Sequence, residues 1–107
     1  MAHNQQVHRV TYFKIEDESA KDKLLGLYKT MRSDALKDGK QYILSAEAGK
    51  IIPDPRNGGF TIAAKTTFAS MEDFEFYDKE CSAHKNLKSY AASVHQGVMM
   101  VYFQSAI

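Results

Sequence analysis

The sequence predicts an α+β fold in which a four-stranded antiparallel sheet carries its helices on one face. The prediction rests first on the order of the segments, which is strand, helix, strand, strand, helix pair, strand. It rests also on the right-handed sense of strand crossovers, which places both helical segments on the same side of the sheet. The 107 residues suffice for one core of this kind, so residues 1–107 are expected to form a single domain.

The first strand and the first helix follow each other closely. Residues 7–15, VHRVTYFKI, are rich in the β-branched and aromatic side chains that strands favour. A helix is predicted over 19–37, because apolar side chains recur there at spacings of three and four. These side chains are Leu24, Leu27, Tyr28, Met31 and Ala35. Asp38 and Gly39 are expected to end the helix, since glycine adopts the left-handed conformation without strain.

The middle of the chain predicts two strands that are joined by a long loop. Residues 41–51 form the expected second strand. Residues 53–59, PDPRNGG, hold both prolines and an Asn-Gly-Gly sequence, which is typical of an exposed loop. The third strand is predicted over 60–69, where the side chains alternate between two faces. One of these faces consists of Phe60, Ile62, Ala64, Thr66 and Phe68.

The last third of the chain predicts two short helices and a final strand. Ser70 precedes two acidic residues, so its hydroxyl is expected to cap a helix. The buried stripe of this helix is expected to be Met71, Phe74 and Tyr77. Helical spacing begins again at His84, after the polar run DKECS. Residues 98–103 are an apolar run too short for a typical helix, and they complete the ferredoxin-like, split βαβ order of elements.

The last strand carries apolar side chains on both of its faces. Val98, Met100 and Tyr102 alternate with Met99, Val101 and Phe103. The chain has helices for only one face of the sheet, so the other face needs a different cover. Most soluble oligomers are symmetric homodimers. The sequence therefore predicts a homodimer, with one face of the strand Val98 to Phe103 in the interface.

The composition argues against several classes of partner. The 14 basic and 13 acidic side chains are interspersed and give a net charge of +1, so neither a nucleic acid nor a membrane is expected as a partner. The first ten residues lack the apolar run of a signal peptide, and no stretch approaches the ~20 apolar residues of a membrane span. We therefore expect a cytoplasmic protein whose residues 1–6 form a flexible leader.

Several short motifs recur in this order and spacing in one known family. They are His8 at the start of the first strand, Asn57-Gly58-Gly59-Phe60-Thr61, the segment from Thr67 to Asp73, Tyr77, and Ala83-His84. With these motifs the chain resembles the stress-responsive α/β-barrel family, also called the Dabb domain, from Val7 to Phe103. The resemblance implies a dimeric α/β barrel. The chain is also similar to small single-domain fungal members that carry no assigned reaction.

The resemblance implies a site between the sheet and the helices. Members similar to plant polyketide cyclases use a Tyr and a His six or seven residues apart, which correspond here to Tyr77 and His84. A histidine can remove a proton next to a carbonyl, and a tyrosine hydroxyl can stabilise the developing oxyanion. His84 is then the candidate base, Tyr77 the candidate donor and His8 a supporting imidazole. The expected lining of the pocket is Tyr12, Tyr28, Ile62 and Phe74.

Two departures from the cyclase pattern keep the reaction open. Ile62 stands where those cyclases carry a further His, and one extra residue separates Tyr77 from His84. The leading interpretation is a small homodimer with a modest apolar pocket and no assigned reaction. One alternative is a cofactor-independent enzyme acting on an aromatic or polyketide-like molecule. Another is a structural stress protein in which side chains fill the site, His84 is bonded to backbone and Tyr77 is a core aromatic.

Neither a metal nor a cofactor is expected. Cys81 and His84 have the spacing of half a zinc site, but the sequence has no second pair of ligands to complete it. The glycines at 58 and 59 precede a strand, whereas a phosphate-binding or dinucleotide-binding glycine loop precedes a helix. The candidate chemistry therefore depends on side chains alone.

Overall fold

The computed structural model describes residues 5–107, and residues 1–4 of the expected leader 1–6 lie outside the described residues. The elements are β1 (Val7–Lys14), α1 (Glu18–Lys29), α2 (Met31–Asp34), β2 (Leu36–Lys37), β3 (Lys40–Gln41), β4 (Ile43–Lys50), the 3₁₀ turn η2 (Pro55–Asn57), β5 (Ile62–Phe68), α3 (Met71–Lys79), α4 (Ser82–Val94) and β6 (Gly97–Phe103).

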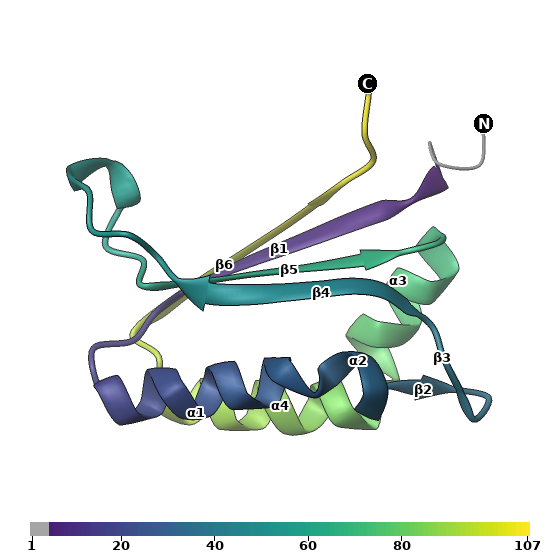
Figure 1. Ribbon diagram of the computed structural model, residues 1–107, viewed down its shortest axis with the longest axis horizontal. Coiled ribbons are helices and arrows are strands. Elements are labelled where there is room, and N and C mark those ends of the chain that lie inside the picture. Colours follow the sequence, from purple (N-terminus) through teal and green to yellow (C-terminus); the bar gives the residue numbers. More distant parts are fainter. Residues whose placement is uncertain (1–4) are drawn as a thin grey trace.

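The main sheet has four antiparallel strands in the order β4-β5-β1-β6, which confirms the predicted ferredoxin-like fold. Helices α1 and α4 lie side by side under one face of this sheet, and no helix covers the opposite face in the part of the chain that the structure describes (Figure 1). Below, the face toward the helices is called the helix face and the other the open face. The core lies between the sheet and the helices.

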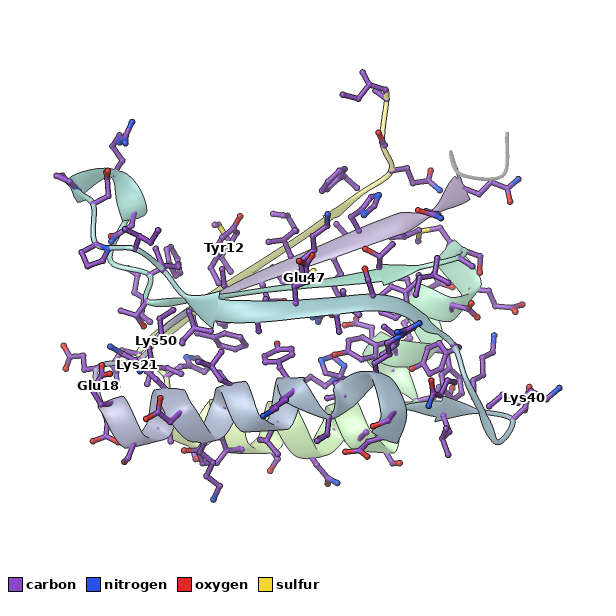
Figure 2. All side chains as sticks on the ribbon, viewed as in Figure 1. Tyr12, Glu18, Lys21, Lys40, Glu47 and Lys50 are labelled. Carbon is purple, nitrogen blue, oxygen red and sulfur yellow. The ribbon has the colours of Figure 1, made fainter. Side chains whose placement is uncertain are left out.

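Strand β1 alternates strictly between the two faces. Val7, Arg9, Thr11 and Phe13 are buried on the helix face, and the residues between them are half-buried on the open face. Figure 2 shows Tyr12 on the open face, on the side away from the helices. This alternation follows from the two-residue period of a strand, and it decides which side chains can reach a site beneath the sheet.

The first helix is shorter than predicted. Asp17 caps α1 by accepting a hydrogen bond from the backbone N–H of Ala20, and the helix ends at Thr30. The predicted helix over 19–37 is therefore wrong beyond α2. Asp38 and Gly39 both have positive φ, 53° and 76°, and they form the two-residue turn that pairs β2 with β3. An Asp-Gly pair suits a tight hairpin turn as well as it suits a helix end.

Two separate helices follow β5, as the sequence predicts. The Ser70 hydroxyl accepts a hydrogen bond from the backbone N–H of Asp73 and so caps α3. Phe74 and Tyr77 are buried, but Met71 is 38% exposed, which corrects the predicted stripe. Met71 is the first residue of the helix. No helix in residues 5–107 is both long and apolar enough to cross a membrane.

The open face carries an apolar band along β1 and the edge strand β6. The register pairs His8 with Phe103, Val10 with Val101, and Tyr12 with Met99 across this face. The three β6 side chains of the band are Met99, Val101 and Phe103, and they are 45–49% exposed. The loop that holds η2 rises from the sheet on the same side, away from the helices (Figure 1).

Candidate functional site

A cavity of about 220 Å³ lies between the helix face of the sheet and the helices α1 and α4. Most of its wall is apolar. The apolar lining residues are Phe13, Tyr28, Leu87, Ala91, Ala92, Val98 and Met100, and the polar ones are Arg9, Thr11, His84, Lys88 and His95. This combination of an apolar wall with a few polar groups is typical of a small-molecule site.

His84 lies in the first turn of α4 and is only 1% exposed. Its Nδ1 lies 2.9 Å from the carbonyl oxygen of Tyr77. A carbonyl can only accept a hydrogen bond, so Nδ1 carries the proton and Nε2 keeps its lone pair in the neutral ring. Nε2 has no hydrogen-bond partner among residues 5–107. One nitrogen therefore fixes the ring while the other remains available.

The His84 ring is neutral at physiological pH. Burial, together with the positive charge of Arg9, lowers the pKa of His84 to about 4, against the opposing hydrogen bond to the Tyr77 carbonyl. Desolvation disfavours the charged imidazolium, and a nearby cation acts in the same direction. At pH 7 the ring is thus in the protonation state that a general base requires.

Tyr77 is brought against His84 despite the extra residue between them. The two rings are stacked with centroids 3.8 Å apart and planes 11° from parallel. The Tyr77 hydroxyl is buried and has no hydrogen-bond partner of good geometry within the described chain. Burial is the main cause that raises the pKa of Tyr77 above its usual range, so the hydroxyl keeps its proton. Tyr77 packs behind His84 and does not line the cavity.

Arg9 is a site residue that the sequence analysis missed. It is 7% exposed, and its guanidinium donates to the Thr11 hydroxyl at 2.9 Å and to the Asp78 carboxylate at 3.0 Å. It also lies 5.4 Å from the centre of the Tyr77 ring. The period of β1 places Arg9 on the same face as Val7 and Phe13, but the sequence alone does not show that this face is the inner one.

His8 does not reach this cavity. It lies on the open face, where its ring stacks on Phe103 with centroids 5.1 Å apart and its Nδ1 is 3.2 Å from the Thr67 hydroxyl. The expectation that His8 adds a second imidazole to the pocket is therefore wrong, because the alternation of β1 places His8 on the open face. The same alternation places Tyr12 on the open face, where it cannot line the cavity. His95, immediately after α4, is the second imidazole of the cavity.

Of the other residues expected to line the pocket, one lies in the cavity wall and two lie in the hydrophobic core. Tyr28 lines the cavity, and burial raises the pKa of its hydroxyl to about 12. Ile62 and Phe74 are buried in the core, and neither lines the cavity. Cys81 is buried and unpaired. Across residues 5–107, His, Cys, Asp and Glu side chains nowhere gather in threes as a metal site would need.

Solved structures of other proteins share this fold. A hydroxynitrile lyase from Passiflora edulis superimposes with a TM-score of 0.80 at 14% sequence identity, over 95% of this chain and 94% of that one. A dimeric ferredoxin-like protein from Thermobifida fusca superimposes with a TM-score of 0.75 at 11% identity, over 94% of this chain and 91% of that one. At these identities the likeness concerns the fold.

Two matches of the sequence are more informative. A Fusaristatin A biosynthesis cluster protein from Gibberella zeae is 39% identical over 100 residues, which is 92% of this chain and 72% of the relative. The stress responsive A/B barrel domain matches residues 7–105, and these residues include every strand and helix described above. The chain therefore belongs to the stress responsive A/B barrel domain family.

Proposed function

We propose that this chain is a cofactor-independent enzyme that removes a proton from a small, mainly apolar molecule bound in the cavity. The observation that carries the proposal is His84, which is held by its Nδ1 and keeps an unpartnered Nε2 at the wall of an apolar cavity. The names of two similar proteins, one from a biosynthesis cluster and one a lyase, support a role in the metabolism of small molecules. A purely structural protein would fill this space with side chains.

The proposed step is an enolisation. Nε2 of His84 takes a proton from a carbon next to a carbonyl, and the electron pair of the broken C–H bond moves onto the carbonyl oxygen. The cationic Arg9 guanidinium in the cavity wall stabilises the resulting oxyanion, and the imidazolium then returns its proton to the product. Tyr77 acts as a positioning residue, because its carbonyl fixes the tautomer of His84 and its ring fixes the plane.

Deuterium exchange tests this step without knowledge of the natural substrate. Phenylacetone in D₂O is the probe, and incorporation of deuterium next to its carbonyl is followed by NMR. The wild-type protein should accelerate exchange above buffer, and His84→Gln should lose at least 100-fold of that rate, as loss of a general base does. His8→Gln on the open face is the matched control and should keep the wild-type rate. Equal rates for His84→Gln and wild type would contradict the proposal.

We propose further that two copies pair through their open faces. The supporting observations are the half-exposed apolar band that contains Met99, Val101 and Phe103, and the absence of a covering helix there within residues 5–107. The similar protein from Thermobifida fusca is described as dimeric. Burial of such a band between two copies is favourable by roughly 25 cal/mol per Å² of apolar surface.

Light scattering measures this pairing directly. The wild-type protein should have twice the 12.1 kDa mass of the chain at micromolar concentration. Val101→Lys places a charge in the middle of the band and should give a monomer, because an unpaired buried charge is costly. Leu36→Lys is the control, since Leu36 is similarly exposed, at 48%, but lies in the hairpin beyond the sheet. A monomeric wild type would overturn the proposed pairing.

A further inference from the structure

Unsatisfied polar groups gather around the cavity. The described chain has four buried side-chain nitrogen or oxygen atoms without a hydrogen-bond partner: Arg9 Nε, His95 Nδ1, Tyr77 Oη and Tyr42 Oη. Arg9 and His95 line the cavity, and Tyr77 stacks on His84, which also lines it. Buried polar atoms without a partner are rare and costly in folded proteins. Two of the four atoms thus belong to residues of one cavity wall. This points to a bound molecule as their missing partner.

The charge around Arg9 specifies what kind of partner is missing. The Arg9 guanidinium has five N–H donors. One terminal nitrogen donates to Thr11 and the other to the Asp78 carboxylate, while the buried Nε–H has no partner. Lys88 also lines the cavity, and its Nζ donates to the main-chain carbonyl oxygen of Asp78 at 2.8 Å. Arg9 and Lys88 are thus cations of the cavity wall, His84 is neutral, and no carboxylate lines the cavity in the described chain. The residues that line the cavity therefore carry an excess of positive charge.

We propose that the molecule bound in this cavity carries a carboxylate, which pairs with the Arg9 guanidinium. The inference rests on the proposed function, and it adds the chemical class of the substrate: a small carboxylic acid with an apolar body. The body packs against Phe13, Leu87 and Val98. The cavity of about 220 Å³ is smaller than the roughly 300–1,000 Å³ of sites for drug-sized ligands, so the acid is smaller than those ligands.

Arg9 also determines specificity in this arrangement. A carboxylate that approaches a buried, partly paired guanidinium forms a charge-assisted hydrogen bond, whereas the corresponding amide forms a weaker neutral one. Asp78 competes for the same cation, since it already accepts from one terminal nitrogen. Removing the carboxylate of Asp78 should therefore strengthen binding of an external carboxylate, and removing Arg9 should weaken it.

The experiment compares phenylacetate with phenylacetamide by titration calorimetry at pH 7. The two probes have the same shape and differ in charge. The wild-type protein should bind phenylacetate about 10- to 100-fold more tightly than the amide. Arg9→Met should abolish this preference and leave the affinity for the amide within a factor of about three. Asp78→Asn should strengthen phenylacetate binding at least threefold. Because the Asp78 side chain is half-exposed, this variant should fold, and it keeps the test decisive if Arg9→Met does not fold.

The outcomes separate this inference from the proposed function. Equal affinities of the wild-type protein for the two probes would overturn the carboxylate class while leaving a cavity that binds apolar molecules. If Asp78→Asn and Arg9→Met both kept the wild-type preference for phenylacetate over phenylacetamide, Arg9 would not be the residue that recognises the carboxylate. If neither probe bound at millimolar concentration, the inference would fail, whereas the proposed proton transfer would still be judged by deuterium exchange.

Discussion

Acid should destabilise the folded protein through His84, and the size of the effect follows from its burial. The pKa of His84 is lowered to about 4 in the folded state, whereas histidine in an unfolded chain has a pKa of about 6.5. Between these pH values the unfolded state binds a proton that the folded state does not. The free energy of unfolding therefore falls as the pH falls through this window, and the part due to His84 amounts to about 2 kcal/mol between pH 7 and pH 4.5.

Urea unfolding followed by circular dichroism measures this loss at pH 7 and pH 4.5. Glutamine cannot take up the proton, so His84→Gln should lose about 2 kcal/mol less stability than wild type over the same interval. Other titrating groups are shared by the two proteins, and the protein concentration is kept fixed because dimers unfold with a concentration dependence. Equal losses in the two proteins would refute the reasoning, as would an NMR titration that places the His84 pKa near 6.5.

Two further substitutions test the local structure by urea unfolding. Ser70→Ala removes the cap of α3 and should cost about 1 kcal/mol, whereas Ser93→Ala, whose exposed hydroxyl donates only to the Tyr90 carbonyl oxygen, should cost less than half of this. Thr61→Val removes a hydroxyl that accepts from the Ile15 N–H at 3.0 Å and donates to the Ile15 carbonyl oxygen at 2.8 Å. It should cost about 1–3 kcal/mol, and an unchanged stability would show that water replaces both bonds.

Most of the fold could be predicted because each element carries its own local signal. β1 has β-branched and aromatic residues, Ser70 caps a helix, and the polar run before His84 separates two helices. The end of the first helix could not be predicted in the same way, because Asp38 and Gly39 favour a helix end and a hairpin turn alike. The choice between them depends on β3 pairing with β2, which is a contact between segments.

The site could be predicted only in part, because it depends on which face of a strand each residue takes. Tyr77 and His84 come together through helix packing that the separation of seven residues permits. His8 and Arg9 are neighbours in the sequence, and one residue of register decides which of them lies under the sheet. β1 has apolar residues of both parities, since one face meets the core and the other carries the open band, so alternation alone does not show which face is inside.

Strand β6 has a consequence for how the protein behaves when it is alone. It is an edge strand, and its apolar side chains are half-exposed on both faces, including Val98 and Tyr102 on the helix face. An edge with free main-chain groups and apolar side chains is a template for irregular strand pairing between molecules. A substitution that separates the proposed pair of copies would then yield a monomer with this edge exposed. Such a monomer should aggregate at high protein concentration. Self-association through the open face thus competes with self-association through this edge.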